Sequence, residues 1–336
     1  MTATRRLRAR VGLVVAIAVL LAMIAVSLSV GARAIPLGVV WDALVHYDPA
    51  STDHIVVVTQ RIPRTVIGVA AGAALAVSGV LMQGLTRNPL ADPGLLGINA
   101  GASVAVLVAI AVLGVTNPNG FVWFAFVGAA VAAVVVALIG GRGPEGASPA
   151  KLALTGAAVT AGLTAVTTFV LVTSSVTYDV YRYWQAGGLT SRGLDAVAAV
   201  ALPLAAGAVI ALVCGRGLDL LALGDESATA LGHDVARTRW LGIVAAVLLC
   251  GSATAIAGPI VFVGLVVPHL LRPLVGTDHR WLMLVGAPAG AALLVCADVV
   301  GRLIAPPGEV QAGLVVAFVG APVLIWLVLR RGKVLL

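Results

Sequence analysis

Ten long apolar stretches constrain this chain more than any other feature of its sequence. Hydrophobic residues make up 60% of it and charged residues only 10%, whereas a water-soluble domain has roughly 25% charged residues. About 20 apolar residues suffice to cross the hydrocarbon core of a bilayer. The sequence therefore predicts an all-α polytopic membrane protein, with transmembrane helices near residues 11–30, 64–85, 95–115, 121–139, 151–174, 195–214, 239–257, 259–274, 281–300 and 311–329.

The first apolar stretch follows four arginines within residues 5–10. This arrangement is similar to a secretory signal, but the stretch is longer than the apolar region of about 7 to 15 residues that a signal contains, and no convincing cleavage site follows it. We therefore expect a retained first helix, within a single transmembrane domain that comprises residues 1–336.

The basic residues predict the orientation in the membrane. If the amino terminus is cytoplasmic, 15 lysines and arginines fall on the cytoplasmic side and six outside, as the positive-inside rule demands. Both termini are then cytoplasmic, and the high pI needs no nucleic-acid partner to explain it. The six outer residues are Arg33, Arg61, Arg64, Arg182, Arg192 and Arg302.

Two segments of the chain are alike, since residues 72–79 read GAALAVSG and residues 251–258 read GSATAIAG. They lie five helices apart and would run in opposite directions, as in an inverted repeat; in a chain this rich in glycine and alanine, a chance match is the alternative. Proline and glycine also interrupt apolar stretches at 93–94 and 258–259. Such breaks either line a solute pathway or are kinks inside a packed bundle.

The sequence contains no motif for catalysis or cofactor binding. Neither Lys151 nor Lys333 follows the glycine-rich loop that holds phosphates, and hydrolase motifs are missing. We therefore expect a protein that is not an enzyme and binds no cofactor or metal. Asp298 is an unusual carboxylate in an apolar stretch, and it precedes Arg302 by four residues, which favours a local ion pair. The scarcity of such carboxylates disfavours an ion-coupled transporter.

The longest internal polar segment comprises residues 217–239. Residues 224–226 favour the start of a helix, residues 227–231 are compatible with one, and Gly232 favours its end. On the predicted topology the segment is cytoplasmic. It forms either a short helix pair that docks a cytosolic protein or an ordinary solvated loop.

Six motifs are spread over residues 61–329: Arg61-Ile62-Pro63-Arg64, then residues 72–83, 88–97, 223–232 and 264–269, and finally Gly320-Ala321-Pro322. In this order they resemble the FecCD-type permeases of ABC importers for iron–siderophore complexes, haem and vitamin B12. The resemblance implies a type II importer fold of ten helices in the bacterial inner membrane. Such a permease dimerises, with itself or with a related chain, around a central translocation path.

The resemblance also implies partners. Two cytoplasmic ABC ATPase subunits would supply the energy, and an extracytoplasmic solute-binding protein would deliver the substrate, which we expect to be a ferric siderophore. Cobalamin or haem uptake by the same family is the first alternative. An ion-coupled secondary transporter is an alternative from a different class.

Residues at the two aqueous faces are assigned by the same resemblance. ATPase coupling would use the segment 217–239, in particular Asp225, Glu226, Ser227, Ala228, Leu231 and Gly232. Docking of the binding protein would use three guanidinium groups, which suit carboxylates, unless these serve as plain interfacial anchors. The three residues are Arg61, Arg64 and Arg302.

Residues of the pathway form the last set. The family's cytoplasmic gate corresponds to Ser148, Pro149 and Ala150, although proline and alanine depart from the small hydroxyl residues expected there. Polar side chains on otherwise apolar segments are candidates to line the path, with helix-packing hydrogen bonds as the alternative. These candidates are Gln83, Asn88, Asn99 and Ser103.

Overall fold

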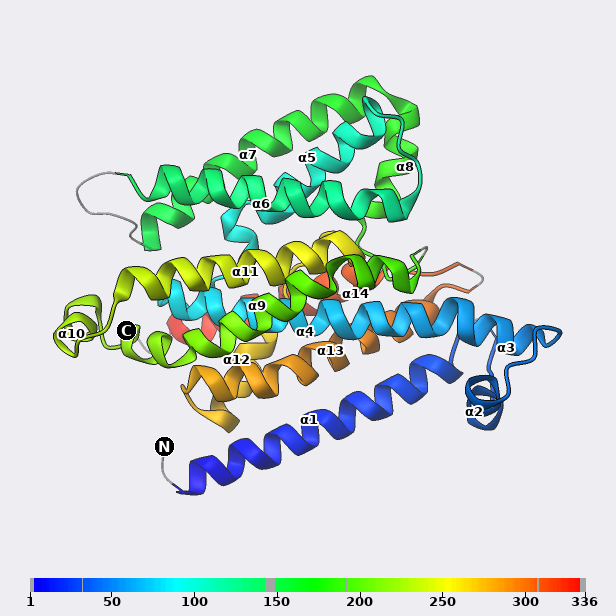
Figure 1. The fold of residues 1–336 in the computed structure, drawn as a ribbon, viewed down its shortest axis with the longest axis horizontal. Helices are drawn as coiled ribbons and strands as arrows, with labels where there is room; N and C mark the ends of the chain where they lie inside the picture. The colour runs from blue at the N-terminus through cyan, green and yellow to red at the C-terminus, as the bar shows by residue number, and fades with distance from the viewer. Residues whose placement is uncertain (1–2, 32, 143–148, 191, 307, 333–336) are drawn as a thin grey trace.

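A computed structural model describes residues 3–31, 33–142, 149–190, 192–306 and 308–332, and within these ranges the chain is a bundle of helices without strands (Figure 1). Seven helices are long and apolar enough to cross a membrane, and three further apolar helices accompany them. Together they correspond in order to the ten predicted stretches. The long helices are α1 (Ala3–Ser29), α4 (Ile62–Thr86), α6 (Phe121–Gly140), α7 (Pro149–Thr173), α9 (Leu194–Leu221), α11 (Val235–Ala257) and α13 (His279–Ile304).

The remaining helices are shorter or lie at the ends of the bundle. The other apolar helices are α5 (Ile98–Ala111), α12 (Val263–Val275) and α14 (Ala312–Gly332). Both chain termini and α10 (Asp225–Ala230) lie at one end of the bundle, and α2, α3 and α8 lie at the other (Figure 1). The last three comprise Leu37–Val45, Thr52–Val56 and Ser175–Gln185.

Helix α4 forms the centre of the bundle. It packs against α9, α11, α12 and α13. In the segment Thr52–Thr86, which contains α4, 78% of the most apolar 18 consecutive residues are buried, whereas the corresponding share for α1 is 6%. A π-helical turn, η1 (Val57–Arg61), joins α3 to α4 without a break. Pro63, which cannot donate a backbone hydrogen bond, is the second residue of α4 and lies directly after this π-helical turn. The central helix therefore connects the two ends of the molecule.

Glycines allow the helices to approach closely. A Cβ added to Gly79 of α4 would overlap the carbonyl oxygen of Gly264 in α12, and one added to Gly72 would overlap that of Gly290 in α13. Within lipid, such close contacts replace the hydrophobic force that drives helices together in water. The small residues of motif 72–83 are thus required by packing.

The two similar segments lie on α4 and α11, which pack against each other and run in opposite directions (Figure 1). The Ser78 hydroxyl donates a hydrogen bond to the Ala246 carbonyl oxygen, at 3.3 Å, across this contact. The opposite directions are those expected of an inverted repeat, and the repeat itself stays a prediction.

Two breaks interrupt the apolar stretches. The first contains the 3₁₀ turn η2 (Pro93–Leu96) before α5, and the second separates α11 from α12, where Gly258 and Phe262 both have positive φ, at 76° and 70°. Phe262 is accommodated because Gly320 has no Cβ to overlap it. Pro93 also lies against Gly264. The irregular backbone is therefore packed inside the protein, as it must be at membrane depth.

Candidate functional site

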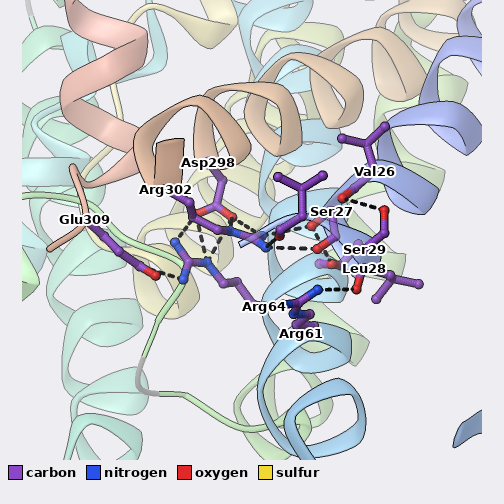
Figure 2. Close-up of polar contacts among 11 residues, drawn as sticks. Val26, Ser27, Leu28, Ser29, Arg61, Arg64, Asp298, Arg302 and Glu309 are labelled. Carbon is purple, nitrogen blue, oxygen red and sulfur yellow. Dashed lines mark hydrogen bonds and ion pairs between the residues drawn. The ribbon is translucent and has the colours of Figure 1, made fainter. Parts of the chain in front are cut away.

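Three predicted docking residues converge at the end of the bundle opposite the termini. Arg61 ends the π-helical turn, Arg64 lies in the first turn of α4, and Arg302 lies in the last turn of α13. Figure 2 shows their side chains directed toward one another and toward the end of α1. We refer to Arg61, Arg64 and Arg302 as the arginine cluster.

One carboxylate binds two members of the arginine cluster. The Nε atom of Arg64 lies 3.0 and 2.9 Å from the two oxygens of Asp298, and its Nη2 atom lies 2.8 Å from Oδ1. Arg302 donates from Nε to Oδ2 of the same carboxylate at 3.0 Å. Asp298 is only 1% exposed, so this network is a buried connection between α4 and α13. The predicted local pair between Asp298 and Arg302 is confirmed.

The arginine cluster also binds the carboxyl end of α1. Nη1 of Arg302 donates to the carbonyl oxygens of Ser27 and Val30 at 2.9 and 3.0 Å, and Nη1 of Arg61 donates to that of Leu28 at 2.7 Å. The last carbonyls of a helix lack intrahelical partners and carry partial negative charge, which a guanidinium satisfies. Arg61 and Arg302 thus anchor α1 to the bundle.

The structure brings the three predicted docking residues together, and it places them in contacts within the chain. Arg61 and Arg302 are only 6% and 5% exposed. Arg64 also donates from Nη1 to Glu309 at 2.7 Å, and Glu309 lies at the surface. Within the described part of the chain, Arg64 is thus the member of the cluster that forms an ion pair with a surface carboxylate, that of Glu309. A direct contact with a binding protein stays a prediction.

Sequence reasoning missed Glu309 and the carbonyl groups of α1 as partners of the arginine cluster. The spacing of Asp298 and Arg302 on one helix was a usable signal. The contact between Arg64 and Asp298 joins residues 234 positions apart, so no local spacing could reveal it.

The segment predicted to couple to the ATPase contains a short helix, α10, at the opposite end of the bundle. Helix α10 starts after Gly224 and ends before Gly232, both of which have positive φ. Asp225 accepts hydrogen bonds from Arg87 at 2.6 Å and from Arg239 at 2.7 Å. This carboxylate therefore fixes α10 to the ends of α4 and α11.

The segment contains one short helix and not the predicted pair. The chain turns at Gly232 and leads directly into α11. Asp234 caps the first turn of α11 by accepting a hydrogen bond from the Arg237 N–H at 2.9 Å. The residues from 235 onward thus belong to α11, and those up to 221 belong to α9. The polar segment is therefore shorter than its composition suggests.

The six predicted coupling residues have different surroundings. Ala228 is fully buried and Asp225 forms the two ion pairs, whereas Leu231 is 64% exposed. The nearby Leu223 is 62% exposed. Leu223 and Leu231 thus expose large apolar side chains at this end of the bundle. The predicted coupling residues that face solvent are Glu226, Ser227, Leu231 and Gly232.

Two of the predicted path residues form hydrogen bonds between helices. Gln83 donates to the Gly264 carbonyl oxygen at 3.2 Å and accepts from Arg272 at 2.6 Å. Asn99 accepts from Thr254 at 2.9 Å. These contacts are the helix-packing alternative that the sequence left open.

The other predicted pathway residues differ in exposure. Ser103 is 9% exposed, and Asn88 is exposed and accepts a hydrogen bond from the Leu90 N–H at 3.0 Å. Of the predicted gate, Ser148 lies outside the described residues, Pro149 is the first residue of α7 and Ala150 is exposed. Roles in a path or gate remain predictions.

A bundle of long apolar helices with buried breaks is the architecture of a polytopic membrane protein. The sequence matches the model of the FecCD transport family over residues 19–330. The chain belongs to this family, and it is a transport component rather than an enzyme.

Known relatives support this assignment. The chain is 47% identical to the ferric enterobactin transport system permease protein FepD of Escherichia coli (strain K12), over 92% of both chains. It is 38% identical to the iron(3+)-hydroxamate import system permease protein FhuB of Bacillus subtilis (strain 168), over 91% of this chain and 80% of that protein. A solved inward-facing structure described as a metal-chelate type ABC transporter aligns with a TM-score of 0.81 and 26% identity, over 96% of this chain and 99% of that one.

Proposed function

We propose that this chain is the membrane-spanning permease of an ATP-driven importer that carries a ferric siderophore into the cell. The observation that carries the proposal is the likeness to a ferric enterobactin permease over nearly the whole length of both chains. The substrate would be an iron chelate that arrives from outside and leaves on the side of α10.

ATP hydrolysis would occur on two partner ABC ATPase subunits that dock against α10. This docking is supported by the exposure of Glu226 on α10 and of Leu231 directly after it. Both termini lie at the same end as α10 (Figure 1), which agrees with a cytoplasmic orientation of that end. A second permease subunit would complete the translocation path.

Motion of the ATPase subunits would reach the bundle through Asp225. Its carboxylate accepts hydrogen bonds from Arg87, directly after α4, and from Arg239 in the second turn of α11. The far end of α4 carries Arg64, which binds Asp298 and the surface residue Glu309. A displacement of α10 would therefore be transmitted along α4 to the outer face, where the solute-binding protein would dock on or beside the arginine cluster.

Ion coupling, the alternative from a different class, receives no support from Asp298. Its carboxylate binds Arg64 and Arg302 and is 1% exposed. Both oxygens of this carboxylate are engaged in hydrogen bonds between α4 and α13, which gives Asp298 a structural role.

Competition for uptake tests the substrate class. The permease is reconstituted into proteoliposomes with its ATPase and with the solute-binding protein encoded beside it, and uptake of iron-55 bound to enterobactin is measured. We expect excess unlabelled ferric siderophore to compete, whereas cobalamin and haemin leave uptake unchanged. Competition by cobalamin or haemin alone would assign the chain to the other substrate of its family.

A further inference from the structure

Helix α2 exposes three large apolar side chains at the end of the bundle opposite the termini. The exposed fractions are 68% for Trp41, 54% for Leu44 and 52% for Val45. Because these residues are spaced by three and four positions, they share one side of the helix. We call Trp41, Leu44 and Val45 the apolar face of α2. Exposed apolar patches mark contacts with a membrane or with another protein.

A second face of α2 is packed against the protein. Val40 and Ala43 are 4% and 2% exposed, and they form a small apolar cluster with Ile35 and Val57 that is separate from the main core. Val57 belongs to the π-helical turn that precedes α4. Since this face is already occupied, α2 cannot rotate to bury Trp41 without exposing the cluster.

The third face of α2 is polar. The Asp42 and His46 side chains are 57% and 78% exposed, and Nδ1 of His46 lies 3.3 Å from Oδ1 of Asp42. Successive residues of a helix are turned by about 100°, so the packed, apolar and polar faces lie about a third of a turn apart. A helix that lies in a membrane surface likewise has an apolar face in the lipid and a polar face in the water.

The position of α2 along the bundle places it at the level of the lipid headgroups. The four arginines within residues 5–10 mark one edge of the membrane. Helix α1 continues after them through residues 11–29, a length of about 29 Å at 1.5 Å per residue. Since the hydrocarbon core is about 30 Å thick, α1 ends close to its far boundary. Helix α2 lies beside this end of α1 and runs across its direction (Figure 1).

The surroundings and composition of α2 favour lipid over a protein partner. Only 6% of the most apolar 18 residues of α1 are buried within the chain, and α1, which contacts α2, lies at the edge of the bundle (Figure 1). The Trp41 indole suits the edge of a bilayer, because it combines an apolar ring with an N–H donor. The sequence of α2, LGVVWDALV, contains no lysine or arginine that would attract an acidic protein surface.

We infer that α2 lies in the headgroup region of the bilayer, with Trp41, Leu44 and Val45 immersed in the lipid beside α1. This lipid contact goes beyond the proposed function, because it depends on neither the substrate nor the energy source. It also has a structural consequence. Arg61 ends the same π-helical turn whose Val57 packs against α2, so the lipid contact of α2 sets the depth of the arginine cluster in the membrane.

Spin labels on the faces of α2 test the inference. The permease–ATPase complex is placed in nanodiscs without a solute-binding protein, in a variant whose three native cysteines are replaced by alanine. A nitroxide is attached to Trp41→Cys, to Leu44→Cys or to the matched control His46→Cys on the polar face. The collision rates of each label with oxygen, which dissolves in lipid, and with a water-soluble nickel complex are then measured. We expect the ratio of oxygen to nickel collisions to be at least fivefold higher at residues 41 and 44 than at residue 46.

Three other results would overturn the inference. Equally low ratios at all three positions would place the whole of α2 in water. Labels at residues 41 and 44 that are shielded from both reagents would show that a protein, such as a second permease subunit, covers the apolar face. Labels that lose contact with the nickel complex only when the solute-binding protein is added would assign the face to that protein.

Fluorescence quenching keeps the test independent of the cysteine replacements. Lipids that carry bromine on the acyl carbons nearest the headgroup quench an indole that they touch. The emission lost in Trp41→Phe, a change that preserves the apolar face, is that of Trp41. We expect at least half of this emission to be quenched by the brominated lipid and little of it by aqueous iodide. Quenching by iodide alone, or by neither reagent, would contradict the lipid contact.

Discussion

Arg64 on α4 binds Asp298 on α13 through three hydrogen bonds of 2.8 to 3.0 Å. Asp298 also accepts from Arg302, which in turn bonds the last carbonyls of α1. One buried carboxylate thus connects the central helix, its main neighbour and the peripheral first helix. The outer end of the bundle depends on this connection for its geometry.

Replacement of Asp298 by asparagine should strongly destabilise the protein. The change leaves Arg64 and Arg302 without their shared counter-charge in a buried environment, and removal of one partner of a buried ion pair costs about 3–5 kcal/mol. Thermal unfolding of the purified permease measures the effect. The matched control is Asp179→Asn, which breaks an exposed pair with Arg182 and should cost less than about 1 kcal/mol. Equal melting temperatures for the two variants would contradict the structural role of Asp298.

Replacement of Glu309 by glutamine should leave stability nearly unchanged and strengthen docking of the solute-binding protein. The Glu309 side chain is 35% exposed, so loss of its pair with Arg64 should cost at most about 1 kcal/mol. The change frees Nη1 of Arg64 for a carboxylate of the partner. A binding measurement with the chelate-free protein checks this. Weaker docking of Glu309→Gln would show that Glu309 itself serves the interface.

Helix packing at glycine gives a third prediction. A Cβ at residue 79 would overlap the Gly264 backbone, whereas a Cβ at Gly162 of α7 meets no atom within 4 Å. Overpacking of this kind typically costs about 1–3 kcal/mol. Gly79→Ala should therefore reduce the yield of monodisperse protein in size-exclusion chromatography, and Gly162→Ala should not. Equal yields would mean that α4 and α12 are packed less closely than the structure indicates.

The sequence predicted the order and the approximate limits of the ten apolar helices, because a bilayer requires a predominantly apolar composition of the helices that cross it. It also predicted α10, since Gly224 and Gly232 mark both of its ends. It did not predict that α10 stands alone. Residues on either side of it continue the long helices α9 and α11, and polar composition does not distinguish a helix extension from a separate element.

The candidate sites were only partly predictable for a related reason. Motifs identified the three arginines, but their partners come from α1, α13 and Glu309. Those contacts join residues that lie far apart in the sequence, so no local spacing of residues indicates them. In the same way, Gln83 and Asn99 are polar residues on apolar helices, and only the structure identifies the neighbouring groups that satisfy them.

The exposed face of α10 provides a fourth prediction. Leu231→Asp should abolish co-purification with the ATPase and reduce ATP-dependent uptake at least tenfold, because a charge would be buried in the proposed interface. Leu37→Asp is the matched control, since Leu37 is 56% exposed on α2 at the opposite end, compared with 64% for Leu231. Both variants should retain the wild-type melting temperature. Normal co-purification of Leu231→Asp would exclude this residue from the coupling surface.

The energy source of transport tests the central claim most directly. Uptake of iron-55 bound to enterobactin is measured in proteoliposomes that contain the permease and its ATPase. ATP is supplied on one side of the membrane and the solute-binding protein on the other. The importer account predicts uptake that requires ATP and is abolished by vanadate, with no uptake from a proton or sodium gradient alone. Gradient-driven uptake that continues without ATP and in the presence of vanadate would contradict it.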